Sequence, residues 1–517
     1  MLSLIGSSTS GQNRWMTVYH DEWDAPMLFV SNSYDQGYLV SGRHQPNYPK
    51  YNWLIKTDIN GNQLWEKLIG DGINSIVLTE METNFIGNTY ICGTTSNYDN
   101  SGDPIVMKLN PCGEKEWCKI LYTEDNHDYA RCLVTTQDGG TAITLSYTGY
   151  EAGQDRICLA KFSSEGLMEW KQCHNSTDSL IGNEDHKNLL RTADNGFLIS
   201  GRCYYPDPQG LYAWPEPYYI KTDSLGNFEW ELVAFSETGE RGGEAWQTIL
   251  NPNNTFYYSS ISYYNYDNGK DAPAILKIDL QGNIVDVYDI SPFGIVGKAF
   301  NAAFINDSTL AVSASWGDPE VNMPMAILID TTGNIYNTQE LLDNSDLSYV
   351  RYTQDGKLLF YTMMKDPSDK KWDAYLFKLD QDLSHAPINT QPFTYDSLCP
   401  YQIASDTISQ DDCGLIVGLE EIEGGPEFEV VESRMVVYPN PARSEISWQL
   451  TVGSRQWGDG CVVEVWDLFG RKVEAMEVPP GQTELKSDVS PWPPGVYIAI
   501  WRSDSEILGR RKFVVAR

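Results

Sequence analysis

Short runs of β-branched and other apolar residues recur along residues 15 to 383, and clusters of Gly, Asn and Asp separate them. A typical group consists of Ser75–Thr79, Thr89–Cys92, Pro104–Leu109 and the segment around Trp117. Runs of this composition between such turn residues are typical of strands in an antiparallel meander. No long segment has the period of an amphipathic helix. The pattern therefore predicts an all-β fold built from four-stranded units.

The units are related by a recurring phrase, Lys-Thr-Asp-x-x-Gly-Asn-x-x-Trp, which runs from Lys56 to Trp65. Copies lie at 108–117, 161–170 and 221–230, weaker ones at 277–283 and 330–334, and a half-copy at 378–380. Gly permits positive φ and Asp and Asn suit tight turns, so the phrase predicts a hairpin between the third and fourth strands. Its Lys and Asp are expected on one strand face, as a surface ladder. A repeat of roughly 50 to 60 residues buries its core only by stacking.

The strands do not count evenly. Third strands occur seven times, but fourth strands follow the phrase only six times, because nothing like Gly-Asn-x-x-Trp follows Asp380. The segment Asn13–Tyr19 supplies a candidate for the missing strand, with Trp15 standing where Trp65 stands. If this N-terminal strand completes the last unit, the ring closes without exposed edges. We therefore predict a seven-bladed β-propeller over residues 12–383, with the repeated tryptophans in its core.

A meander places its connections on two faces. The turns between strands one and two and between three and four share one face, which we call the turn face. The longer and more variable connections share the opposite loop face, where binding residues usually lie. Aromatic side chains there suit sugar or protein contact, and Arg43 and Arg202 both end a second strand as Ser-Gly-Arg. The candidate ligand-binding residues are Tyr48, Tyr98, Tyr150, Tyr205, Trp214, Tyr264, Trp316, Trp372, Arg43 and Arg202.

Composition narrows the class of protein. With 37 Lys and Arg against 71 Asp and Glu, the net charge of −34 argues against nucleic acid or anionic lipid as a partner. No run approaches the ~20 apolar residues of a membrane-spanning helix. Ten cysteines without a CxxC pair indicate disulfides and an oxidising compartment. The pairs Cys112–Cys118, Cys158–Cys173 and Cys399–Cys413 are candidates, and the connectivity stays open.

The repeat stops near His385, and residues 384–430, with Pro387, Pro392 and an acidic run from Glu420, are expected to form a linker. Alternating strands after residue 431 predict a small β-sandwich. Four motifs occur there in order: Tyr-Pro-Asn-Pro-Ala, Asp-x-x-Gly-Arg, Gly-Val-Tyr and a basic end. Residues 431–517 closely resemble the type A C-terminal sorting domain of type IX secretion cargo. The matching residues are Tyr438, Pro439, Asn440, Pro441, Gly470, Arg471, Gly495 and Tyr497.

The resemblance implies recognition by the type IX secretion machinery and a secreted or outer-membrane surface location in a Gram-negative bacterium. It also implies that the sorting domain is removed after export and that the cargo carries a signal peptide. Residues 1–11 lack the basic region of a signal peptide, and we interpret them as its remnant or as disordered. The repeat region resembles secreted propellers that often carry this tail. That resemblance supplies no catalytic motif.

Candidate chemistry is sparse. Asp58, Asn60 and Asn62 resemble a calcium loop, but six copies on the turn face favour a hairpin, so we expect no cofactor or metal and leave calcium as the alternative. Loop histidines lack metal-site spacing.

Glycosidase chemistry needs two placed carboxylates or a Tyr nucleophile. We expect a glycan- or protein-binding protein rather than an enzyme. A sialidase-like hydrolase and a structural surface protein are the alternatives. Carboxylates and an Arg beside the channel would favour the hydrolase.

Overall fold

The structure is a computed structural model, and the chain divides into two units, residues 1–419 and 420–517. The residues that it describes are 15–19, 27–43, 51–96, 102–122, 128–147, 156–174, 182–206, 213–235, 241–265, 270–291, 296–317, 323–341, 345–365, 372–416, 434–438, 442–451, 461–467, 471–479, 482, 484–502 and 507–516. The described residues form strands and turns, and none of them belongs to a helix that could cross a membrane.

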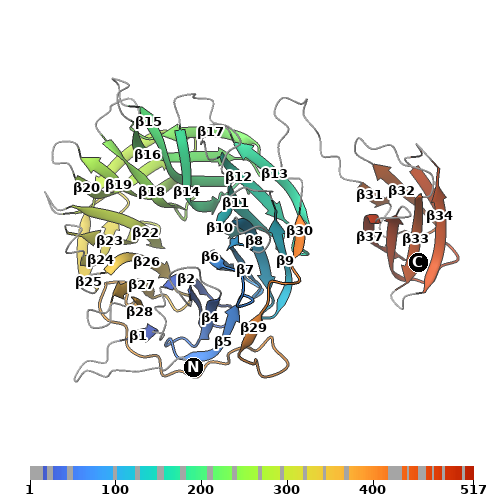
Figure 1. The fold of residues 1–517 in the computed structure, drawn as a ribbon, viewed down its shortest axis with the longest axis horizontal. Helices are drawn as coiled ribbons and strands as arrows, with labels where there is room; N and C mark the ends of the chain where they lie inside the picture. The colour runs from blue at the N-terminus through green and yellow to red at the C-terminus, as the bar shows by residue number, and fades with distance from the viewer. Residues whose placement is uncertain are drawn as a thin grey trace. The chain divides into compact units, whose positions relative to one another are not determined.

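Seven sheets, each built on four antiparallel strands, make up most of the described part of the first unit (Figure 1). We number them sheets 1 to 7, starting at β2. The strands of sheets 1 to 3 are β2 (Met27–Asn32), β3 (Tyr38–Arg43), β4 (Asn52–Thr57), β5 (Gln63–Ile69); β6 (Ile76–Thr83), β7 (Thr89–Thr95), β8 (Asp103–Leu109), β9 (Lys115–Leu121); β10 (Tyr129–Thr135), β11 (Thr141–Tyr147), β12 (Arg156–Phe162) and β13 (Met168–His174).

The remaining sheets follow the same order, and the first strand of each sheet faces the middle of the unit (Figure 1). Their strands are β14 (Gly182–Arg191), β15 (Phe197–Pro206), β16 (Ala213–Thr222), β17 (Phe228–Val233); β18 (Arg241–Leu250), β19 (Phe256–Asn265), β20 (Lys270–Asp279), β21 (Ile284–Asp289); β22 (Gly297–Asn306), β23 (Thr309–Trp316), β24 (Met323–Asp330), β25 (Ile335–Glu340); β26 (Ser345–Tyr352), β27 (Leu358–Lys365), β28 (Trp372–Leu379) and β1 (Met16–Tyr19).

The N-terminal strand β1 belongs to the last sheet. It pairs antiparallel with β28, from Met16 opposite Phe377 to Tyr19 opposite Ala374. Trp15, just before β1, is 2% exposed and packs in the cluster that joins sheets 1 and 7. The pairing that the position of Trp15 predicts is therefore present.

The repeated phrase has a double role in packing. Its Asp closes the hairpin: Asp58 Oδ1 accepts hydrogen bonds from the amides of Asn60 and Asn62, each at 2.8 Å. The same bonds recur at Asp223, Asp279 and Asp330. The carboxylate that resembles a calcium ligand in the sequence is thus engaged by the turn itself.

The Gly and Trp of the phrase meet across neighbouring sheets. A Cβ atom on Gly166 of sheet 3 would lie 2.6 Å from Trp117 Cδ2 of sheet 2. Gly226 lies against Trp170 and Gly282 against Trp230 in the same way, and Gly61 of sheet 1 lies against Trp15. Each turn therefore needs a glycine because the indole of the preceding sheet occupies the space of a side chain.

We expect Gly166→Ala to lower the free energy of unfolding by about 2 to 4 kcal/mol, from positive φ and from the clash with Trp117. Gly139→Ala in the same sheet is the matched control, because Gly139 has a similar φ of +85° but its nearest neighbour would be Ser164 Cβ at 4.0 Å. That variant should lose only about 1 kcal/mol. Urea unfolding followed by Trp fluorescence measures both, and equal losses would contradict packing of the indole on the turn.

The Lys of the phrase is buried, which corrects the prediction of a surface ladder. Lys56 Nζ lies 2.6 Å from Asp35 Oδ1 in the turn between strands one and two, and both side chains are at most 3% exposed. Lys221 and Lys378, each 3% exposed, pair with Asp194 and Asp355, although the Asp194 side chain is itself exposed. The backbone places strand three beside the first turn, so the Lys that appeared to face solvent is enclosed with a counter-ion.

Residues 385–416 form a strap, in place of the linker expected from residue 384. Within the strap, β29 (Asp406–Ile408) pairs in parallel with β5, and β30 (Gly414–Ile416) pairs in parallel with β9. Disulfides Cys112–Cys399 and Cys118–Cys413 fix the strap to sheet 2. The predicted pairs Cys112–Cys118 and Cys399–Cys413 are therefore wrong, because each strap cysteine lies beside a cysteine of the sheet. The predicted Cys158–Cys173 disulfide is confirmed.

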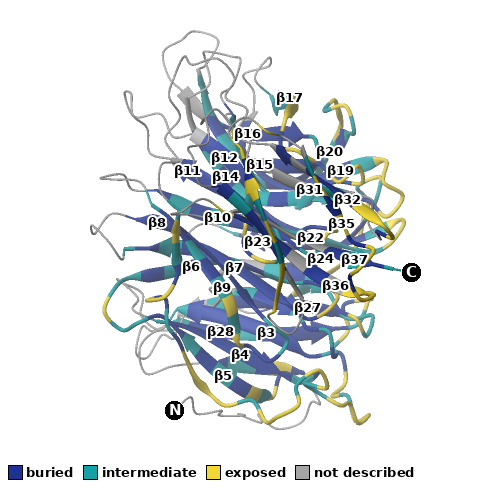
Figure 2. Cartoon of the chain, turned by 90° about the vertical axis from the view of Figure 1, so that its right-hand side faces the viewer, coloured by how far each residue is buried: buried dark blue, intermediate teal, exposed yellow. Residues whose placement is uncertain are grey.

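The second unit contains two sheets in its described part, ordered β31-β32-β35 and β34-β33-β36-β37. The buried residues of this unit include Trp448, Trp501 and Phe513. Figure 2 shows buried residues along the strands and exposed residues mainly at the turns. Its strands are β31 (Arg434–Tyr438), β32 (Glu445–Thr451), β33 (Cys461–Asp467), β34 (Lys472–Val478), β35 (Glu484–Asp488), β36 (Gly495–Arg502) and β37 (Ile507–Val515).

Candidate functional site

The predicted loop-face residues are only partly brought together. Tyr48, Tyr98 and Tyr150 lie outside the described residues. Trp214 and Tyr264 lie in β16 and β19, where only their backbone is described. Tyr205 and Trp372 are half-buried at strand ends.

Trp316 corrects one of these predictions. It is 8% exposed and packs in the core of sheets 5 and 6, so it is a packing residue. Its position at the end of β23 made it appear to belong to a loop. Arg43, in contrast, lines a cavity, and Arg202 pairs with Asp185 and Glu244.

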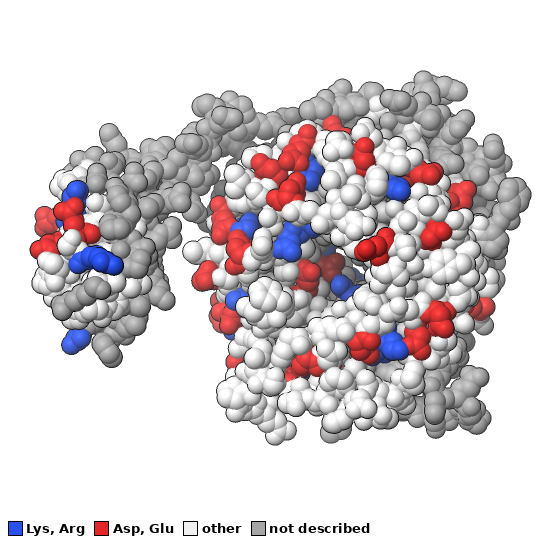
Figure 3. Space-filling model, turned by 180° about the vertical axis from the view of Figure 1, so that it is seen from behind, with Lys and Arg blue, Asp and Glu red and all other residues white. Residues whose placement is uncertain are grey.

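A cavity of about 380 Å³ lies among the first strands of the sheets. Figure 3 shows a hollow in one face of the unit, with acidic and basic side chains inside it. The charged side chains that line the cavity are Arg43, Glu80, Glu82, Arg131, Lys187 and Arg351. Apart from Arg43, sequence reasoning missed them. The signal in the sequence was that some first strands contain charged residues among otherwise apolar ones.

Two carboxylates and an arginine of the lining act on one another. Glu80 and Glu82 alternate along β6, so both side chains leave the same face of the strand. Burial raises the pKa of Glu80 to about 7, even though Arg351 acts in the opposite direction. Burial also raises the pKa of Glu82. Glu80 is therefore partly protonated at neutral pH, and burial disfavours the charged form of both groups.

Glu82 also has a structural contact. One of its carboxylate oxygens accepts a hydrogen bond from the amide of Thr135, at 2.5 Å, and so links sheets 2 and 3. Backbone amides of a following sheet donate hydrogen bonds in the same manner to the side-chain oxygens of Asn188, Gln247 and Asn301. Glu80 accepts only from the adjacent Met81 amide among the bonds between described residues. Glu80 is therefore the freer of the two carboxyl groups.

A second charged group lies on β14, β18 and their neighbours. Asp185 contacts Arg131, Lys187 at 3.0 Å and Arg202 at 3.4 Å. Glu244 lies 3.3 Å from Arg202 and 3.5 Å from Lys298. The two carboxylates thus hold four cations that come from sheets 3, 4 and 6.

Aromatic side chains adjoin these cations. The ammonium groups of Lys187 and Lys298 lie 5.2 and 5.7 Å from the ring centroid of Trp246. Trp246 meets Phe300 edge-to-face at 5.1 Å, and Tyr349 stacks on Tyr361. The indole nitrogen of Trp246 is buried and has no hydrogen-bond partner among the described residues. Rings beside charged groups suit a ligand with both apolar faces and polar substituents.

Arg43 differs from Arg131 and Lys187, the lining cations that make ion pairs. Its guanidinium makes no ion pair within the described part of the chain, and its buried Nε has no partner there. Burial lowers its pKa, and no carboxylate offsets that effect. Arg202, which the sequence places at the end of a second strand, lies within β15, four residues before its end at Pro206, and is held by two carboxylates.

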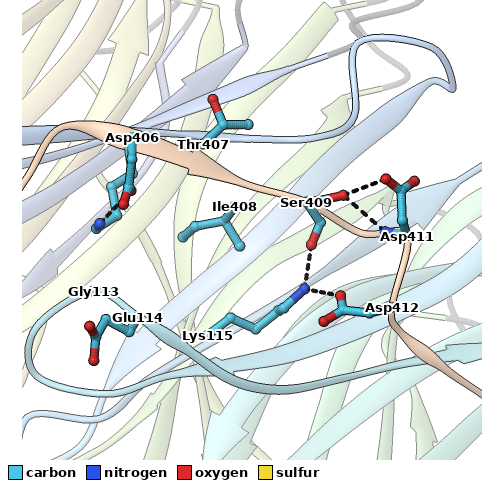
Figure 4. Close-up of a pocket in the computed structure, with 10 residues that line it drawn as sticks. Gly113, Glu114, Lys115, Asp406, Thr407, Ile408, Ser409, Asp411 and Asp412 are labelled. Atoms are coloured by element: carbon cyan, nitrogen blue, oxygen red, sulfur yellow. Dashed lines mark hydrogen bonds and ion pairs between the residues drawn. The ribbon is translucent and has the colours of Figure 1, made fainter.

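A further cavity, of about 500 Å³, lies between the strap and the outer strands of sheets 1 and 2 (Figure 4). Lys115 Nζ donates to the carbonyl of Ser409 and to Asp412, while Lys67 pairs with Asp406 at 2.5 Å. Both cations are neutralised by the strap. Within the described residues, moreover, no group of His, Cys, Asp and Glu could hold a metal ion. This cavity therefore offers less chemistry than the central one.

Comparison with known proteins identifies the tail. Residues 436–516 match the secretion system C-terminal sorting domain. The sorting domain supports the assignment of this chain as type IX secretion cargo, and hence a secreted or cell-surface location. Of its motif residues, Tyr497 is 4% exposed and donates to the carbonyl of Pro493, Gly495 begins β36, and Tyr438 ends β31. Pro439, Asn440, Pro441 and Gly470 lie outside the described residues, whereas Arg471 is described and exposed.

Several solved structures show a distant similarity to this chain. An ulvan lyase of polysaccharide lyase family PL25 has a TM-score of 0.48 at 11% identity, over 69% of this chain and 94% of that one. The Dos1 propeller has a TM-score of 0.42 at 10% identity, over 69% and 93%. Periplasmic gluconolactonase PpgL from Pseudomonas aeruginosa has 0.37 at 8%, over 70% and 97%. No curated protein matches the sequence significantly. Such identities do not indicate a shared ligand or reaction.

Proposed function

We propose that residues 12–383 form a closed seven-bladed β-propeller and that the sorting domain, of type A, directs it to the outer surface of a Gram-negative cell. Two contacts support closure: β1 pairs with β28, and Gly61 of sheet 1 lies against Trp15, beside sheet 7. Closure would leave no first or last sheet edge exposed. On this proposal the sorting domain is removed after export, and the propeller acts at the surface.

The propeller binds a glycan, in this proposal, through its central cavity and the adjoining loop face. The observation that carries the proposal is the cavity of about 380 Å³, in which Trp246 and Tyr349 lie beside charged groups. Aromatic faces pack against sugar rings, and charged or amide groups fix the orientation of hydroxyl and acidic substituents. A protein ligand on the same face is the alternative within this class.

A carbohydrate-active hydrolase is the second candidate, and one observation favours it. Glu80 and Glu82 project into the cavity beside Arg351, which is the arrangement expected of such an enzyme. Glycosidases need one protonated and one ionised carboxyl group, and the raised pKa of Glu80 meets the first need. A Tyr361 nucleophile is less suitable, because burial raises the pKa of that phenol to about 12.

A glycan-array screen of the full chain, with hydrolysis assays on the glycans that bind, tests the proposal. We expect binding to at least one glycan class, reduced at least tenfold by Trp246→Ala. Lys357→Gln on the turn face is the control and should bind normally. Hydrolysis that Glu80→Gln abolishes, with binding retained, would favour the enzyme. No bound glycan on the array would overturn the proposed function.

A further inference from the structure

The central cavity reverses the charge of the protein that surrounds it. The whole chain has about half as many Lys and Arg as Asp and Glu, 37 against 71. The cavity lining, in contrast, contains four cations and two acids: Arg43, Arg131, Lys187 and Arg351 against Glu80 and Glu82. A cationic cavity within an acidic surface focuses its field on an anion that reaches the opening.

The acids do not neutralise all of these cations. Glu80 and Glu82 lie within electrostatic range of Arg351, and Asp185 contacts Arg131 and Lys187. Arg43 has no carboxylate within contact distance in the described part of the chain; Arg351 has none either, but Glu80, Glu82 and Tyr361 act on its guanidinium, whereas no acidic group is known to act on that of Arg43. An unpaired charge removed from water carries a cost that structural packing does not explain. A guanidinium in this position is matched by a ligand that brings its own negative charge.

The chemistry of that charge follows from the guanidinium. Its planar set of N–H donors binds carboxylate and sulfate oxygens in pairs, which an ammonium group cannot do. The rings of Trp246, Phe300 and Tyr349, which line the same cavity, supply the apolar area that a sugar ring would cover. A monosaccharide unit with one acidic substituent therefore uses both features of the cavity.

We infer that the cavity recognises an anionic polysaccharide, and that Arg43 binds the carboxylate or sulfate group of a sugar unit that enters the cavity. This inference rests on the proposed glycan binding and adds the charge of the ligand. Arg351, held between Glu80, Glu82 and Tyr361, positions the acids and is not the principal anion ligand. Arg43 was selected in the sequence only as a loop-face residue; the cavity gives it this role.

Isothermal titration of the full chain with three oligosaccharides of equal length tests the inference. The probes are an oligogalacturonate, a sulfated galactan and an unsulfated galactan. We expect at least tenfold tighter binding of one acidic probe than of the neutral one, and the preferred probe distinguishes carboxylate from sulfate. Arg43→Gln should remove that preference, and Arg43→Lys should restore part of it. Lys357→Gln, with the same loss of charge on the turn face, should keep it.

The possible failures are distinguishable. If the neutral galactan binds as tightly as both acidic probes, glycan binding stands and the inference is overturned. If no glycan binds on the array or by titration, both are overturned. The melting temperature of Arg43→Gln is measured first, to show whether this variant folds. The salt dependence of binding by the native chain provides a second test, which needs no variant. Raising NaCl from 50 to 500 mM should weaken its binding of the acidic probe severalfold, and an affinity insensitive to salt would overturn the inference.

Discussion

We expect the chain that lacks both strap disulfides to have a free energy of unfolding about 8 kcal/mol lower than that of the native chain, and the chain that lacks only one of them to lose about 3 kcal/mol. Cys112–Cys399 and Cys118–Cys413 close loops with sequence separations of 287 and 295. While one disulfide remains, the other constrains a loop of only about 20 residues. The first loss is therefore modest, and the second releases nearly 300 residues.

Urea unfolding of three variants measures this non-additivity: Cys112→Ser with Cys399→Ser, Cys118→Ser with Cys413→Ser, and all four together. The matched control is Cys158→Ser with Cys173→Ser, whose separation of 15 predicts a loss of about 3 kcal/mol. A fourfold variant that loses no more than the sum of the two pairs would contradict this account. The strap strands β29 and β30 should then also keep their amide protection from exchange.

The second large effect that we expect comes from Glu216→Gln. This variant should become more stable than the native chain, by a margin that grows as pH rises. Glu216 is 4% exposed in β16, and one of its oxygens has no partner among the described residues. Burial raises its pKa to about 9. In the unfolded chain the carboxyl group ionises near its ordinary pKa, so the folded state holds a proton that the unfolded state releases.

The sign follows from that difference. Below the unfolded pKa both states are protonated and Glu216 imposes no pH-dependent penalty. Between about pH 4.5 and 9 the free energy of unfolding falls by about 1.4 kcal/mol per pH unit, or at most about 3 kcal/mol by pH 7. Glutamine cannot ionise, so the melting temperature of Glu216→Gln should equal that of the native chain at pH 4 and exceed it increasingly up to pH 9.

Glu165→Gln provides a control of opposite sign. Glu165 is exposed, and a hydrogen bond from the Ser164 hydroxyl at 2.7 Å lowers the pKa of its carboxyl group. That group adds stability above its unfolded pKa and loses it as pH falls, so the glutamine variant should be slightly less stable at pH 7 than at pH 3, relative to the native chain. A Glu216→Gln variant with a pH-independent difference would show that Glu216 ionises normally when folded.

Local chemistry explains how much of the scaffold could be predicted. Asp, Gly and Asn in a hairpin act through bonds within five residues, so the turn at Asp58–Asn62 was readable from the phrase. The strand that carries Trp15 was readable because a fourth strand was missing at the other end of the repeats. The burial of Lys56 was not, because its partner Asp35 lies in a different turn, 21 residues away.

The candidate site was largely unreadable for the same reason. Its lining joins Arg43, Glu80, Lys187, Trp246 and Arg351, which are separated by up to about 300 residues, and each occupies an ordinary strand position. The loop-face hypothesis selected exposed-looking aromatics, and Trp316 lies in the core instead. Only Arg43 was found by both routes. No sequence motif identifies these residues, because they come together only in the folded chain and do not recur at a fixed spacing.

The sequence by itself determined the all-β fold, the stacked repeats, the N-terminal strand of the last sheet and the sorting domain, since each depends on periodicity or on residues close together in the chain. The tertiary structure alone decided which cysteines pair, which charges are buried and where a cationic cavity opens in an acidic protein. Those features depend on distances between remote residues, and backbone geometry, rather than sequence order, sets those distances.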